Sequence, residues 1–127
     1  MSVEENKIVI RRLFEEGLNQ GNLAVVDELF TSDFIDHSTP SQIPGPQGVK
    51  DYFSMVHAGF PDVHVTIDDL IAEGDKVVVR TTWCGTHQSS HEDRDPTNTQ
   101  VTRTLIQIFY LQGGKIQQEW NEGEGPG

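Results

Sequence analysis

Apolar residues recur at helical spacing in three segments of the first sixty residues. At the start of the first segment, Ser2 and Glu5 match a capping box, in which each side chain bonds to an exposed backbone amide group of the first turn. The pattern predicts a helix from there to about residue 19, a short second helix over residues 23–30, and a third helix that begins at Pro46.

From residue 63 onward the chain instead alternates apolar and polar residues, which is typical of half-buried strands. We expect strands over residues 63–72, 77–87, 101–111 and 116–121, joined as an antiparallel meander, and a brief strand near residues 34–38. Helices followed by strands predict an α+β fold, with N-terminal helices packed in a cone against a curved, mostly antiparallel sheet. Such a cone encloses a pocket at its open end.

The strand predicted over residues 77–87 has polar groups on both faces. Because side chains alternate across a strand, Trp83 and His87 share one face with Val77 and Val79, whereas Arg80 lies on the other. We expect the face with Trp83 and His87 to line the pocket, and Arg80 to form an ion pair within the fold.

Composition narrows the choice of partner and setting. The 127 residues suit one domain, which we assign to residues 1–121, with a frayed tail over 122–127. A net charge of −11 argues against nucleic acid and anionic membranes and leaves a small, weakly charged molecule open. With a single cysteine, Cys84, and no signal-peptide pattern, we expect a soluble cytoplasmic protein without a metal or other cofactor.

A polar segment between the second and third predicted strands gathers potential metal ligands, including His91, Glu92, Asp93 and Asp95. They follow no recognised ligand spacing and lie in a breaker-rich stretch, so we interpret this segment as a solvated hairpin loop. Its length also suits a lid over the pocket mouth.

Several short motifs occur in a characteristic order along nearly the whole chain. They are Asn19-Gln20-Gly21-Asn22, Asp36-His37, Phe60-Pro61-Asp62, Ala72-Glu73-Gly74-Asp75-Lys76-Val77, Arg80, Gly85-Thr86-His87, Pro96-Thr97, and Gly114-Lys115-Ile116 with Glu119-Trp120. In these motifs the chain resembles the SnoaL-like polyketide cyclases of the nuclear-transport-factor-2-like (NTF2-like) superfamily.

The resemblance implies an NTF2-like cone that binds a small, mostly apolar carbonyl compound, with a homodimer through the sheet. It implies a cyclase or isomerase acting by proton transfer next to a carbonyl, of the intramolecular aldol type; the alternative is a non-catalytic ligand-binding or assembly domain. In the family's cyclases an acidic residue shortly after the last Trp is the general acid or base. Here Trp120 is followed by Asn121, and an amide cannot take up that proton.

Candidate catalytic groups are therefore His37, Asp62, His87 and Glu122. Two of them have a structural alternative, because Asp62 follows a proline where Asp often caps a turn, and His87 ends a strand where it can bond to a backbone carbonyl. We prefer His37 to its neighbour Asp36 as a pocket group. The residues expected to line the pocket are Phe14, Phe34, Tyr52, Phe60, Trp83, Trp120 and Asn121.

Overall fold

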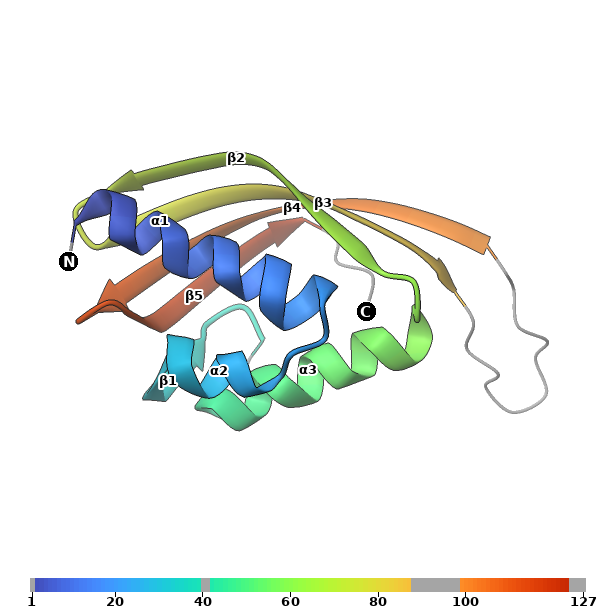
Figure 1. Ribbon diagram of the computed structural model, residues 1–127, viewed down its shortest axis with the longest axis horizontal. Helices are drawn as coiled ribbons and strands as arrows, with labels where there is room; N and C mark the ends of the chain where they lie inside the picture. Colours follow the sequence, from blue (N-terminus) through green and yellow to red (C-terminus); the bar gives the residue numbers. More distant parts are fainter. Residues whose placement is uncertain (1, 40–41, 88–98, 124–127) are drawn as a thin grey trace.

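The computed structural model describes residues 2–39, 42–87 and 99–123. Its elements, in chain order, are α1 (Val3–Arg12), η1 (Leu13–Asn19), α2 (Ala24–Leu29), β1 (Phe30–Asp36), α3 (Pro46–Gly59), β2 (His64–Glu73), β3 (Lys76–His87), β4 (Thr99–Gln112) and β5 (Lys115–Gly123). Figure 1 shows the helices on the inner side of a curved sheet. The predicted α+β fold is confirmed.

The helices begin where the sequence predicts. Ser2 caps α1, since its hydroxyl accepts from the Glu5 amide (3.1 Å) and the Glu5 carboxylate accepts from the Ser2 amide (3.2 Å). The first helix then widens into a π-helix over η1, so that the predicted single helix to residue 19 has two geometries. Its apolar face is fully buried, as at Ile10 and Leu18.

The sheet has five strands in the order β1-β5-β4-β3-β2. The predicted meander is β2 to β5, all antiparallel. The fifth strand is β1, which extends the brief predicted strand back to Phe30 and pairs in parallel with β5. This parallel edge brings the ends of β1 and β5 together.

A β-bulge in β5 determines which side chains face the helices. Ile116 pairs with Leu111 and Gln118 with Tyr110, so two steps along β5 match one step along β4, and Gln117 is the extra residue. After the bulge, Glu119 and Asn121 point inward and Trp120 points outward. The strand continues to Gly123, two residues beyond its predicted end, and residues 124–127 of the predicted tail lie outside the described residues.

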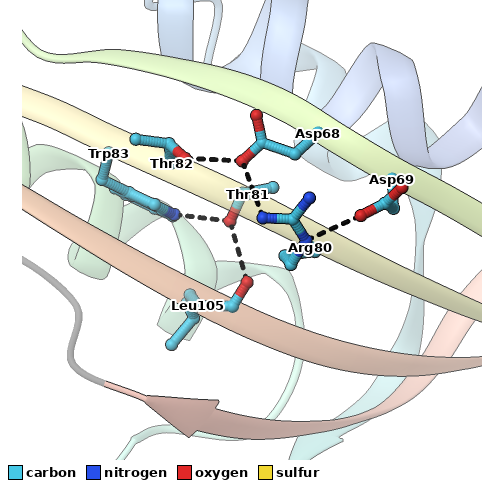
Figure 2. A network of polar contacts seen from close by, with 7 residues as sticks. All are labelled: Asp68, Asp69, Arg80, Thr81, Thr82, Trp83 and Leu105. Carbon is cyan, nitrogen blue, oxygen red and sulfur yellow. Dashed lines mark hydrogen bonds and ion pairs between the residues drawn. The ribbon is translucent and has the colours of Figure 1, made fainter.

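A second bulge, at Asp68 in β2, turns two successive carboxylates to the outer face. Figure 2 shows Arg80 of β3 between them, with Nε 2.6 Å from Asp69 Oδ2 and Nη1 3.9 Å from Asp68 Oδ2. Arg80 therefore lies on the face opposite Trp83 and forms an ion pair within the fold, as predicted. In the described parts of the chain, no helix is long and apolar enough to cross a membrane.

Candidate functional site

A cavity of about 410 Å³ lies between the helices and the inner face of the sheet. It is lined by Leu13, Phe14, Phe30, Asp36, Ser38, Thr39, Gln42, Val49, Tyr52, Phe53, Met55, Trp83, Leu105, Gln107, Glu119, Asn121 and Gly123. The volume suits a small organic ligand.

One wall of the cavity is aromatic. Phe14 of η1 and Trp83 of β3 meet edge to face, with ring centroids 6.2 Å apart. The Trp83 indole N–H donates to the Thr81 hydroxyl (2.9 Å), which donates to the Leu105 carbonyl (3.4 Å), as Figure 2 shows. Because the indole N–H bonds within β3, Trp83 presents an apolar surface of fixed orientation.

The cavity is also lined by two carboxyl groups from neighbouring strands. Asp36 of β1 and Glu119 of β5 are directly opposite each other in the parallel pair, so their side chains share the inner face. The backbone amide of His37 donates to the Glu119 carbonyl (2.9 Å) and holds the two strands together at this point. The fold thus brings two acidic groups side by side in the lining of the cavity.

Two amides join these carboxyl groups. Gln107 of β4 donates through Nε2 to Glu119 Oε2 and to Asn121 Oδ1, both at 2.8 Å. Asn121 in turn donates through Nδ2 to Asp36, at 3.1 and 3.3 Å from its two oxygens. The Asp36 carboxylate also accepts from the backbone amide of Ser38 (2.9 Å).

The surroundings of Glu119 favour its protonated form. Burial and the nearby negative charge of Asp36 raise the pKa of Glu119 to about 8, and hydrogen bonds from Gln107 and Asn121 oppose the rise only in part. Tyr52 of α3 lines the same cavity. Burial, together with the negative charges of Glu119 and Asp36, raises the pKa of Tyr52 to about 12. At neutral pH the site therefore holds a neutral Glu119, a neutral phenol and the Asp36 charge.

This arrangement can move a proton. A carboxylate within reach of a ligand can act as a base, and a protonated carboxyl in the same cavity can act as an acid. In the described parts of the chain, no group of three His, Cys, Asp or Glu side chains forms a metal site.

Four of the seven predicted pocket residues line the cavity: Phe14, Tyr52, Trp83 and Asn121. Phe34 instead packs against Phe30 in the core, with centroids 4.7 Å apart, and Phe60 is buried beneath His87. Trp120 lies on the outer face because of the bulge at Gln117, and it stacks on His37 with ring centroids 4.4 Å apart.

The four candidate catalytic residues do not meet in this cavity. His37 bonds to Gln118 outside it (2.9 Å), and Glu122 is exposed on the outer face. His87 lies against Phe60, with centroids 5.2 Å apart. Asp62 is exposed and accepts from the Thr86 amide (2.7 Å) and hydroxyl (2.9 Å), bonds that hold the pKa of Asp62 below its usual range. Its partner lies on β3 and not in the adjacent turn, so the role is structural but differs from the predicted turn cap.

Sequence reasoning missed Asp36, Gln107 and Glu119 as site residues. Asp36 stands two residues after the buried Phe34, so alternation along the strand could have identified it. No local signal identifies Glu119, since the bulge at Gln117 reverses the alternation that begins at Ile116. The residues 91–95, predicted as a solvated loop that could cover the pocket mouth, lie outside the described residues.

Fold and cavity together define a small α+β cone with a pair of carboxyl groups inside. The chain belongs to the SnoaL-like polyketide cyclase family, whose pattern it matches over residues 8–124.

Solved structures share this fold. TsrD from Streptomyces laurentii is 22% identical with a TM-score of 0.87, over 98% of this chain and 91% of that one. A protein from Jannaschia sp. CCS1, provisionally a SnoaL-like polyketide cyclase, is 23% identical (TM-score 0.82, 95% and 86% covered). IdmH from Streptomyces antibioticus, provisionally a polyketide cyclase, is 26% identical (TM-score 0.80, 94% and 91% covered). No curated protein matches the sequence significantly.

Proposed function

We propose that the protein binds a small, mostly apolar carbonyl compound in this cavity and transfers protons next to the carbonyl, as an aldol-type cyclase or an isomerase. The observation that carries the proposal is Glu119, a carboxyl group with a pKa of about 8, in the same cavity as the Asp36 carboxylate. Two carboxyl groups in different protonation states are the recurring arrangement for acid and base work at neutral pH.

In a ring closure, Asp36 takes a proton from the carbon beside one carbonyl group, and its carboxylate becomes a carboxylic acid. The resulting enolate carbon attacks a second carbonyl carbon and forms the new carbon–carbon bond. Glu119 donates its proton to the oxygen of that second carbonyl, which becomes a hydroxyl group. In an isomerisation, Asp36 instead returns its proton to a different carbon. General acid–base catalysis of this kind contributes about 10²–10⁴-fold in rate.

The apolar wall supports the ligand class. Phe14 and Trp83 offer flat surfaces on which rings can lie, and their packing in the core holds them in place. Asp36 and Glu119 line the same cavity, so a ligand with a carbonyl group and a hydrocarbon part can contact both kinds of surface.

Hydrogen exchange tests the proposal directly. We expect the protein to accelerate deuterium incorporation beside the carbonyl of 2-tetralone in D₂O, followed by proton NMR. Asp36→Asn should reduce the acceleration about 10²-fold, because the amide cannot take the proton. Asp33→Asn is the control, since Asp33 is exposed on the same strand. Equal acceleration by wild type and Asp36→Asn would contradict the assignment of Asp36 as the base.

The second candidate is a ligand-binding domain without turnover. Asn121 favours it, because an amide stands where the cyclases of the family have an acidic residue. Saturable binding of 2-tetralone with no acceleration of exchange would support this alternative over the enzyme.

We also propose a homodimer through the outer face of the sheet. Ile71, Val78, Ile108 and Trp120 form an apolar row across the four strands β2 to β5, because each is the register partner of the next. Ile71 is 64% and Ile108 37% exposed, and contiguous apolar surface of this kind commonly marks an interface. A cytoplasmic setting fits Cys84, which is exposed and has no disulfide partner.

A further inference from the structure

A line of hydrogen bonds connects the two carboxyl groups of the cavity. It runs from Asp36 to Asn121, from Asn121 to Gln107, and from Gln107 to Glu119, across the neighbouring strands β1, β5 and β4. Asn121 and Gln107 are register partners, as are Asp36 and Glu119. The backbone pairing therefore holds all four side chains on one face.

The charge of Asp36 determines how both amides are oriented. An ionised carboxylate only accepts hydrogen bonds, so Asn121 must turn its NH₂ group toward Asp36. The Asn121 oxygen then faces Gln107, which must turn its own NH₂ group toward it. The same Gln107 nitrogen also reaches Glu119 Oε2, so this oxygen of Glu119 is an acceptor.

The environment of the buried Gln107 side-chain oxygen is consistent with these amide orientations. Gln107 is only 6% exposed, and its Oε1 has no hydrogen-bond partner among the described residues. A rotation of the amide by 180° would place Oε1 against Asn121 Oδ1, which is also an acceptor. An unsatisfied buried oxygen destabilises the fold, so a specific interaction must hold the amide in the observed orientation.

We propose that Asn121 and Gln107 are positioning residues that form an amide relay: the charge of Asp36 orients both amides and thereby places the proton of neutral Glu119 on Oε1. The oxygen Oε2 is occupied as an acceptor for Gln107, which leaves Oε1 to carry the acidic hydrogen. The use of this hydrogen as the acid toward a ligand carbonyl rests on the proposed function.

The relay gives the amide at position 121 a role. An ionised Asp there would place a third carboxylate against Asp36. It could still accept from Gln107 but could not donate to Asp36, so the link between Asp36 and Gln107 would be lost. In this chain the acid and base positions are instead 119 and 36, and Asn121 links them.

Side-chain amide NMR of ligand-free protein tests the relay. In the wild type, both NH₂ protons of Gln107 are hydrogen-bonded, so both signals should be well dispersed and protected from exchange with water. In Asp36→Asn, at least one of the two Gln107 NH₂ protons should lose its protection from exchange with water. Asp36 has no direct hydrogen bond to Gln107, so such a change would be transmitted through Asn121. The matched control Asp33→Asn, also on β1, should leave both signals in place. Unchanged Gln107 signals in Asp36→Asn would overturn the proposal.

A double-mutant comparison separates the relay from a through-space effect of the charge. Asn121→Leu cuts the relay and keeps the Asp36 charge, so adding Asp36→Asn to it should produce no further change at Gln107. A further change of the same size as in the wild-type background would also overturn the relay. If Asp36→Asn alone fails to fold, a loss of one protected Gln107 proton in Asn121→Leu supports the relay, and retention of both contradicts it.

The amide relay and the proposed function can be contradicted separately. These spectra are recorded without substrate, so the relay stands if its signals respond as expected while 2-tetralone exchange is not accelerated. Accelerated exchange with unresponsive Gln107 signals would remove the relay and leave the proposed function.

Discussion

Glu119 is a carboxyl group that the fold keeps neutral at physiological pH. Its position on the inner face follows from the bulge at Gln117, and its pKa of about 8 follows from burial and the charge of Asp36. Its hydrogen-bond partner in β4, Gln107, is an amide rather than a cation. A group held in this way can donate a proton under conditions where an exposed Glu has already lost it.

The raised pKa has a consequence for stability. In the unfolded chain Glu119 titrates near 4.5, and in the folded protein at about 8. Between these values the folded protein holds a proton that the unfolded chain has released. The contribution of Glu119 to the free energy of unfolding therefore falls as pH rises from about 4.5 to 8, by up to about 1.4 kcal/mol per pH unit.

We expect Glu119→Gln to abolish this decrease in the free energy of unfolding with rising pH. Urea unfolding at intervals from pH 5 to pH 8.5 should show the variant gaining stability relative to the wild type as pH rises. Glu122→Gln is the control, because Glu122 is exposed on the same strand and should keep the wild-type slope. Parallel pH profiles for wild type and Glu119→Gln would contradict the raised pKa.

The elements of this fold are determined largely by local pattern, whereas the site depends on how strands pair. The capping box, the apolar faces of the helices and the alternation in β2 to β4 were enough to predict an α+β cone and to place Trp83 inside. The register of β5 was not predictable in the same way. One extra residue, Gln117, exchanges the faces of Glu119 and Trp120, and only the pairing with Leu111 and Tyr110 reveals it.

The parallel pairing of β1 with β5 could not be predicted from the sequence either. Asp36 meets Glu119 because residues 83 positions apart in sequence become register partners, and no spacing within either segment indicates this. The preference for His37 over Asp36 as a pocket group was wrong, because the strand directs Asp36 inward and His37 outward. Alternation counted from Phe34 would have indicated Asp36.

Helix α3 supports one side of the cavity and offers a test at the scale of an element. A Cβ added at Gly48 would lie 1.9 Å from the Ile43 carbonyl oxygen, whereas one at Gly59 meets no atom within 4 Å. Gly48→Ala should lower the free energy of unfolding by about 1–3 kcal/mol through this clash. Gly59→Ala, in the same helix, should be neutral or raise it by up to about 1 kcal/mol.

Chemical denaturation measures both variants. Because Gln42 lines the cavity beside the Gly48 contact, Gly48→Ala should also weaken 2-tetralone binding. Equal effects of the two substitutions would show that the segment before α3 does not pack as described.

As a whole, the molecule uses the two faces of one sheet differently. The inner face carries the cavity, and the outer face carries the apolar row of Ile71, Val78, Ile108 and Trp120 beside the Arg80 ion pairs. The alternation of side chains keeps these surfaces apart, so a partner on the outer face leaves the carboxyl pair untouched.

If the protein dimerises through this apolar row, a charged side chain in the row should disrupt the dimer. Ile108→Glu should convert a dimer into a monomer, because a carboxylate in the centre of an apolar interface lacks a partner. Ile43→Glu is the control, since Ile43 is 57% exposed and lies before α3, outside the sheet. Light scattering after gel filtration gives the mass of each variant; a monomeric wild type would contradict the dimer.

The central claim is that the cavity holds a protonated Glu119 beside an ionised Asp36. The most direct test is the titration of the Glu119 side-chain carboxyl carbon by ¹³C NMR, with the signal assigned from its absence in Glu119→Gln. We predict a pKa of about 8 in the wild type and a lower pKa in Asp36→Asn, where the neighbouring charge is gone and burial still acts. A wild-type Glu119 that titrates near 4.5 would contradict the claim.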